Sequence, residues 1–246
     1  MATVADKRRT FAELHKSGCF VIPNPWSVGT ARYLQGLGFK AIASTSAGYA
    51  HSRGLPDGGV GLEDVLAHYR ELANATDIPL NADFENCFAD DADGVAANVA
   101  RCIETGVAGL SIEDSPQHGN FPLYEFDLAL ARVKAARAAI DRSRTGVVLT
   151  ARTEGFIRGR PDIEETVRRL KAFADAGADC LYSPGIKSRE HIEATVKAVG
   201  GKAINFLNPV PLGYTVDEIA KEGKFDLFDG VVSNAELNKF FGARRV

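Results

Sequence analysis

Residues 79–114 read PLNADFENCFADDADGVAANVARCIETGVAGLSIED and contain one complete unit of a strand-helix-strand pattern. A short apolar run, PLNADF at 79–84, is followed by a polar loop and then by DADGVAANVARCIETG at 91–106, where apolar residues recur three and four positions apart. This spacing predicts a helix that ends near Gly106, and the next apolar run at 108–114 predicts a second strand. Two strands joined by one helix predict a parallel pair with a right-handed crossover.

The same unit repeats along most of the chain. Eight strands are expected, at 19–24, 41–45, 79–84, 108–114, 146–153, 180–185, 202–208 and 227–233. Helical spacing lies between them, for example at 61–76, 127–143 and 163–177, and the last of these ends at Gly177. Eight such units predict an α/β fold, a single (β/α)8 TIM barrel that occupies residues 1–246 as one domain. An open doubly wound sheet is the alternative, although no GxGxxG motif follows the first strand.

The two ends of the chain add to this expectation. The stretch VADKRRTFAELHKSG at 4–18 predicts an extra N-terminal helix that covers the bottom of the barrel. After the eighth expected strand only NAELNKFFGARRV at 234–246 remains, which predicts a shortened C-terminal helix.

Composition indicates the class of partner. The formal net charge of -3 gives no reason to expect nucleic acid or an acidic membrane surface, so a small molecule is the expected ligand. The four cysteines are scattered without a CxxC pair, which argues against a zinc site and a disulfide framework and favours a reducing cytoplasm. No apolar run approaches the ~20 residues of a membrane helix, so no membrane association is expected.

Acidic side chains lie where several of the expected strands end. Asp83 and Glu85 follow the third strand, Glu113 and Asp114 end the fourth, and Asp57 lies in the loop after the second. The carboxyl ends of the strands form the active face of a barrel. Two carboxylates ~4 Å apart repel by roughly 4 kcal/mol at an effective dielectric of about 20. The acids therefore need a cation, and oxygen ligands favour Mg²⁺, or Mn²⁺, over zinc. Alternatively, Asp114 or Glu85 pairs with a nearby arginine or lysine.

A basic residue ends the fifth strand in ARTEG at 151–155. The guanidinium of Arg152 can hold a carboxylate through two parallel hydrogen bonds. A metal and an arginine at one barrel mouth together predict an anionic substrate.

Five segments in this order and spacing resemble the isocitrate lyase/phosphoenolpyruvate mutase superfamily, in its phosphonomutase-like branch. They are ASTSAGYAHSRGLPDGG, NADFEN, SIEDS, ARTEG and RRLKAFADAGADCLYSPG, and the resemblance covers about residues 10 to 210. It implies a (β/α)8 barrel that forms a homo-oligomer, usually a tetramer that exchanges its last helix. It also implies Mg²⁺-dependent chemistry on 2-oxo or 2-hydroxy acids.

The resemblance implies a role for each matching position. Asp83 resembles the direct metal ligand, while Asp57, Glu85 and Glu113 resemble acids that bind the waters of the metal. The residues expected to bind the substrate are Ser44, Ser46, Ala47, Arg152 and Asn205, and the catalytic candidates are Arg152, Glu113 and His118. The metal would then hold the carboxylate and the adjacent oxygen of a small acid while an enolate forms.

The loop after the fourth strand decides which bond breaks, and here it reads SPQHGNFPLYEF. It lacks the Lys-X-Cys-Gly-His segment of isocitrate and methylisocitrate lyases, and the lysine with an Asn-Ser pair of phosphoenolpyruvate mutases. His118 can serve as a general acid or base, or it is a solvated loop histidine. Cys87 is expected to be a small packing residue because no histidine close in the sequence would activate it.

Three functions remain open at this point. The first is a Mg²⁺-dependent lyase that cleaves a carbon–carbon bond of a small carboxylic acid. The second is a phosphonomutase or a hydrolase that acts on a carbon–phosphorus bond of a phosphono-carboxylate. The third is a barrel that binds a dicarboxylate without catalysis. Glycoside hydrolysis fits less well, because the chain has one tryptophan to stack on sugars.

Overall fold

The structure is a computed structural model, and it describes residues 2–116, 122–208 and 225–229. Within these ranges lie eight strands and eight helices. The strands are β1 (Cys19–Val21), β2 (Ile42–Ala43), β3 (Leu80–Ala82), β4 (Gly109–Glu113), β5 (Val148–Arg152), β6 (Cys180–Tyr182), β7 (Ala203–Asn208) and β8 (Phe225–Asp229). The helices are α1 (Val4–Leu14), α2 (Val28–Gly36), α3 (Ser46–Ser52), α4 (Leu62–Ala75), α5 (Ala92–Ile103), α6 (Phe126–Ser143), α7 (Ile163–Asp175) and α8 (Arg189–Ala198).

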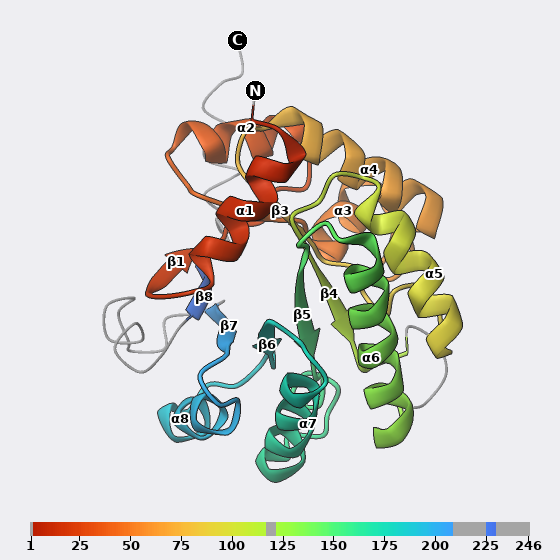
Figure 1. Cartoon of the computed structure of the whole chain (residues 1–246), viewed down its shortest axis with the longest axis vertical. Coiled ribbons are helices and arrows are strands. Elements are labelled where there is room, and N and C mark those ends of the chain that lie inside the picture. The colour runs from red at the N-terminus through yellow and green to blue at the C-terminus, as the bar shows by residue number, and fades with distance from the viewer. Residues whose placement is uncertain (1, 117–121, 209–224, 230–246) are drawn as a thin grey trace.

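All the strands belong to one parallel sheet in the order β1-β8-β7-β6-β5-β4-β3-β2. From β2 to β8 each strand pairs with the next one in the sequence, so the order never reverses as it would in a doubly wound sheet, and that alternative is wrong. The sheet curls until its outer strands approach each other, where the Ala43 N–H donates to the Pro23 carbonyl at 3.0 Å. Figure 1 shows the curled sheet with helices α4 to α8 on its outside. This is an α/β fold of the TIM-barrel type.

Helices α5 and α7 lie within their predicted ranges, with the predicted residues at their ends. Asp91 accepts a hydrogen bond from the Gly94 N–H at 2.8 Å at the start of α5, and Asp162 caps α7 in the same way. Gly106 and Gly177 follow these helices with φ of 94° and 99°, which glycine adopts without strain.

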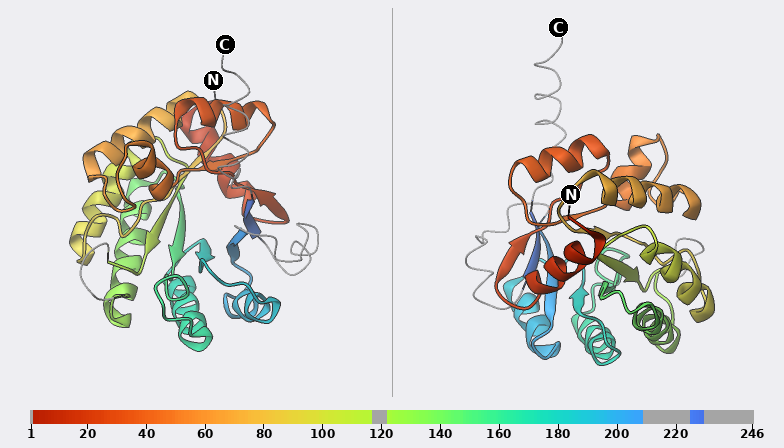
Figure 2. Two further views of the ribbon diagram at one scale, coloured as in Figure 1. Left: turned by 180° about the vertical axis from the view of Figure 1, so that it is seen from behind. Right: turned by 45° about the horizontal axis from the view of Figure 1, so that its top comes forward.

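Helix α1 precedes β1 and packs at the end of the sheet where the strands begin, as Figure 2 shows in its right-hand view. Phe11 is fully buried there in one cluster with Ile22, Ala41, Ala43, Ala108 and Val148. Gly109 at the start of β4 makes room for it, because a Cβ there would lie 2.5 Å from Phe11 Cε1. Lys7 and Arg8 donate to backbone carbonyls at the ends of α4 and α5, which neutralises these helix ends.

The strands β1 to β7 all lie inside their predicted ranges and are shorter than predicted. The eighth strand starts at Phe225 rather than at 227, because Phe225 and Asp226 already pair with β1 on one side and with β7 on the other. Residues 230–233 of that prediction and the expected C-terminal helix lie outside the described residues. None of the helices in the described ranges is both long and apolar enough to span a bilayer.

Candidate functional site

The carboxyl ends of β3, β4 and β5 meet around Arg152, the last residue of β5. Its Nη1 lies 2.6 Å from Asp83 Oδ1 and 3.1 Å from Glu113 Oε1, and its Nε lies 3.0 Å from Glu154 Oε1. Glu113 and Arg152 are register partners across β4 and β5, so their side chains leave the same face of the sheet. The acids therefore gather at one place, as their positions at the strand ends predict, and there they surround a guanidinium.

The charges in this cluster are well buried. The side chains of Glu113 and Glu154 are only 4% and 1% exposed. Burial raises the pKa of both carboxyl groups, and the charge of Arg152 works in the opposite direction. Although burial lowers the pKa of Arg152, the charges of Glu113, Glu154 and Asp83 raise it well above its ordinary value, so the guanidinium stays charged. It also lies over the ring of Tyr182, 4.8 Å from the ring centroid.

Asp83 is held from several sides. The Ser46 N–H, at the start of α3, donates to Asp83 Oδ2 at 3.0 Å, and the Asp83 N–H donates to Ser44 Oγ at 2.8 Å. The Tyr69 hydroxyl of α4 donates to the Asp83 carbonyl at 2.5 Å. Two of the predicted substrate-binding residues, Ser44 and Ser46, thus contact Asp83 in this structure, and Ala47 follows them as a half-buried residue of α3.

Glu85 lies next to this cluster in a strained part of the β3–α5 loop. It has a φ of 48°, it is buried, and its Oε2 has no hydrogen-bond partner among the described residues. Burial, followed by the charges of Asp83 and Asp57, raises the pKa of Glu85 to about 8. Asp57 is exposed in the loop between α3 and α4, yet it is close enough to affect Glu85.

The chemistry of these donors fits a hard divalent cation. Asp83, Glu85, Glu113 and Glu154 place four carboxyl groups around one guanidinium, and oxygen atoms are the ligands that Mg²⁺ prefers. In the part of the chain that the structure describes, no three acidic, histidine or cysteine side chains lie close enough together to hold a metal ion directly. A site with one direct carboxylate, and with the other acids holding waters of the ion, does not require such a group.

Asp114 takes no part in the cluster. Its carboxylate accepts hydrogen bonds from the Thr153 hydroxyl at 2.7 Å and from the Glu154 N–H at 2.9 Å, and it pairs with Arg169 of α7 at 3.1 Å. Asp114 is the residue after Glu113. Because side chains alternate between the two faces of a strand, the Asp114 side chain points to the opposite face and contacts the surrounding helices. The alternative that an acid of this segment pairs with an arginine therefore holds for Asp114.

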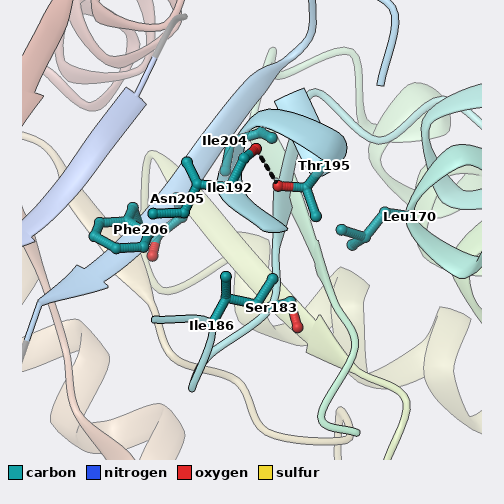
Figure 3. A pocket seen from close by; sticks show the side chains of 8 residues that line it. All are labelled: Leu170, Ser183, Ile186, Ile192, Thr195, Ile204, Asn205 and Phe206. Carbon is teal, nitrogen blue, oxygen red and sulfur yellow. Dashed lines mark hydrogen bonds between the residues drawn. The ribbon is translucent and has the colours of Figure 1, made fainter. Parts of the chain in front are cut away.

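Asn205 lies in the same register row as Tyr182, on β7. It lines a cavity of about 10 Å³ between β6, β7, α7 and α8, and Figure 3 shows it with Ser183 and the apolar side chains around them. Asn205 Oδ1 and Ser183 Oγ have no hydrogen-bond partner among the described residues. A cavity of this size admits one water molecule, and it does not contain the acids of the Arg152 cluster.

Two other candidates have different outcomes. Cys87 is fully buried, and burial raises the pKa of its thiol to about 12, so it is a packing residue as predicted. His118 lies within 117–121, outside the described residues.

From the sequence, Glu154 is expected at the barrel mouth but has no assigned role, and Tyr69 is not expected at the site. Glu154 contacts Arg152, but two residues after a strand it looks like an ordinary loop acid. Tyr69 holds the Asp83 carbonyl, but its position on α4 matches that of a core aromatic. The number of acidic residues near the strand ends is the one signal in the sequence that indicates a role for Glu154. Nothing in the sequence indicates a role for Tyr69.

Comparison with known proteins finds relatives over most of the chain. An oxaloacetate decarboxylase from Paraburkholderia xenovorans (strain LB400) is 30% identical over 208 residues, which cover 81% of this chain and 68% of that protein. A Burkholderia cenocepacia J2315 protein, provisionally classed as a lyase/mutase, has a TM-score of 0.91 at 39% identity and covers 98% of this chain and 87% of its own. A phosphonopyruvate hydrolase in complex with oxalate and Mg²⁺ has a TM-score of 0.82 at 25% identity, with 100% and 85% covered.

The phosphoenolpyruvate phosphomutase family model matches residues 11–225, which is most of the chain. The homologues include carbon–carbon lyases. The chain therefore belongs to the phosphoenolpyruvate phosphomutase family, within the isocitrate lyase/PEP mutase superfamily.

Proposed function

We propose that this protein is a Mg²⁺-dependent lyase that cleaves a carbon–carbon bond of a small 2-oxo or 2-hydroxy carboxylic acid through an enolate-like intermediate. One observation carries the proposal. Asp83 and Glu113 share the guanidinium of Arg152 at the ends of three neighbouring strands, with Glu85 buried beside them. Such a site combines an excess of carboxylates, which favours a cation, with an arginine that favours an anionic substrate.

In this proposal Asp83 is the direct metal ligand, and Glu85, Glu113 and Asp57 hold waters of the ion. Mg²⁺, for which Mn²⁺ can substitute, would stabilise the negative charge that develops on the oxygen of the enolate. The 17% exposed side chain of Asp83 gives it access to a ligand.

The substrate carboxylate would bind to Arg152 and to the first turn of α3. Nε and Nη1 of Arg152 contact the acids, and Nη2 would bind the substrate carboxylate. Ala47 would offer its N–H and Ser46 its hydroxyl at the start of α3, and Ser44 is a buried neighbour that holds Asp83. Asn205 would contact the far end of the substrate, and His118 would exchange protons with it.

Two of the similar proteins support the substrate class. One is an oxaloacetate decarboxylase, and the other is bound to oxalate and Mg²⁺. Oxalate carries two adjacent oxygens like the enolate of a 2-oxo acid. Because the second of these proteins is a phosphonopyruvate hydrolase, cleavage of a carbon–phosphorus bond stays the second candidate.

A substrate panel tests the proposal. The protein is incubated with oxaloacetate, other 2-oxo and 2-hydroxy acids and phosphonopyruvate, with Mg²⁺ or with EDTA, and products are identified by NMR. We expect Mg²⁺-dependent cleavage of a carboxylic acid, lost in Asp83→Asn and kept in Glu63→Gln, which changes only a surface pair with Arg101. Release of inorganic phosphate from phosphonopyruvate alone would favour the second candidate. Binding of oxalate without any turnover would favour a dicarboxylate-binding barrel.

The proposal also covers the complete fold, the oligomeric state and the cellular compartment of the protein. We infer one closed (β/α)8 barrel over residues 1–246, with α1 as an addition to the barrel, that forms a homo-oligomer in the cytoplasm. The four cysteines are scattered along the sequence without a CxxC pair, which supports a reducing compartment. Sedimentation of the purified protein measures the oligomeric state.

A further inference from the structure

A second small cavity lies beside Glu85, where α3 and α4 approach the end of β3. It has about 10 Å³ of space for a ligand, and its walls include Thr45, Tyr49, Val65, His68 and Glu85. A volume of this size admits one water molecule, provided that it finds two to four polar partners.

Two residues that line this cavity each carry an unpaired buried polar atom. His68 Nε2 and Glu85 Oε2 have no hydrogen-bond partner among the described residues, and the two residues are only 4% and 3% exposed. An unpaired buried polar atom is costly because it has given up its hydrogen bonds to water. Two such atoms, on residues that line one water-sized cavity, therefore point to a bound molecule that satisfies both.

His68 is fixed in a single orientation. Its ring stacks on Tyr49 of α3 with the centroids 3.7 Å apart and the planes inclined by 6°. Burial, and then the charge of Arg53, lower the pKa of His68 to about 4, so the ring is neutral near pH 7. A water molecule donates and accepts hydrogen bonds, so it can pair with Nε2 in either tautomer.

We propose that one buried water bridges His68 Nε2 and Glu85 Oε2, and that His68 is thereby a positioning residue for Glu85. The role toward metal rests on the proposed function, in which Glu85 holds waters of the ion. A carboxylate fixed by a bridging water presents its other oxygen in one direction, whereas an unsupported carboxylate samples several rotamers.

A crystal structure tests whether a water molecule bridges His68 and Glu85. A structure of the wild-type protein at high resolution should show one water within ~3.2 Å of both His68 Nε2 and Glu85 Oε2. An empty cavity, or a direct hydrogen bond between the two side chains, would overturn the bridge. This measurement needs neither a variant nor turnover.

The positioning role is tested by titrating Mn²⁺ into the protein and following the free ion by EPR. His68→Leu keeps the size of the side chain but removes the partner of the water, and we expect its Mn²⁺ affinity to fall roughly 10-fold. His68→Gln offers a polar group again and should recover most of the affinity. Val65→Ala loosens the same cavity wall without changing a polar atom, and it should bind Mn²⁺ like the wild type.

The outcomes separate this inference from the proposed function. If the wild type binds Mn²⁺ and His68→Leu binds it equally well, the positioning role is wrong while the metal site stands. If the wild type binds no Mn²⁺, the proposed function fails and the positioning role fails with it, and the crystal density still decides the bridge. Equal losses in His68→Leu and Val65→Ala would assign the effect to packing and overturn the role of His68.

Discussion

Arg152 is the residue on which the site depends most, because the buried acids Glu113 and Glu154 and the half-buried Asp83 share its charge. Arg152→Met leaves these acids without a cation. Removing one partner of a buried ion pair costs ~3–5 kcal/mol, and proton uptake by Glu113 and Glu154 offsets part of it. We expect a loss of about 3 kcal/mol in the free energy of unfolding, measured by urea denaturation at pH 7. Arg101→Met, which breaks a surface pair with Glu63, should cost under ~1 kcal/mol.

His68 gives the protein a dependence on pH that one variant can isolate. Its pKa is about 4 in the folded protein against an ordinary value of 6.5, so the unfolded chain binds more protons between these values. Stability from this group is complete above pH 6.5 and is lost as the pH falls toward 4. Between pH 7 and pH 5 the wild type should lose about 2 kcal/mol more than His68→Leu. Parallel urea curves of both proteins at the two pH values measure the difference, and equal losses would show that His68 does not titrate in this way.

At the residue scale, the sequence predicts which side chains gather but not what each one contacts. Asp83 and Glu113 could be placed together because parallel strands end at one rim. That Asp114 pairs with Arg169 depends on the alternation of side chains along a strand whose exact register is unknown beforehand. The unpaired atoms of His68 and Glu85 depend on how α3 and α4 pack, which no local pattern encodes.

Among the elements, α1 packs closely against β4 because Gly109 of β4 has no side chain. A Cβ on Gly109 would lie 2.5 Å from Phe11 Cε1 and 2.5 Å from Asn81 Oδ1, so Gly109→Ala forces the helix or the strand to shift. Overpacking of this kind costs ~1–3 kcal/mol, and we expect thermal unfolding to report a loss in that range. Shortening the partner in Gly109→Ala/Phe11→Leu should recover part of the loss beyond additivity. Gly36→Ala in α2 meets no atom within 4 Å and should be neutral or stabilising.

The elements themselves were the most predictable part of the chain. Helices α5 and α7 follow from apolar spacing bounded by an aspartate and a glycine, because these residues have definite capping roles. The positions of the strands were predicted, but the predicted ranges were too long, because apolar residues continue past the ends of the strands into the loops. The predicted start of β8 was wrong because the pairing of Phe225 and Asp226 with β1 and β7, which extends the strand, is a tertiary contact that no local pattern encodes.

At the scale of the whole molecule, the curled sheet links the two ends of the chain. Strand β1 pairs with β8, and the loop after β1 is joined to β2 by the hydrogen bond from Ala43 to Pro23. A unit connected in this way should unfold in one transition. Trp26 is the single tryptophan of the chain and lies between β1 and α2, so its fluorescence reports that region, while far-UV circular dichroism reports the helices. The two thermal transitions should therefore coincide.

Mg²⁺ together with oxalate extends this prediction to the site. A ligand that binds only the folded state stabilises it by RT ln(1 + [L]/Kd), about 2.7 kcal/mol at 100 times Kd. The site lies at β3 to β5, remote in sequence from Trp26, yet in one cooperative unit both signals should move to higher temperature by the same amount. Asp83→Asn should abolish the shift in both, because it removes the proposed metal ligand. A shift seen by circular dichroism but not by Trp26 would mean that the β1–α2 region unfolds separately, and the single-domain proposal would fail.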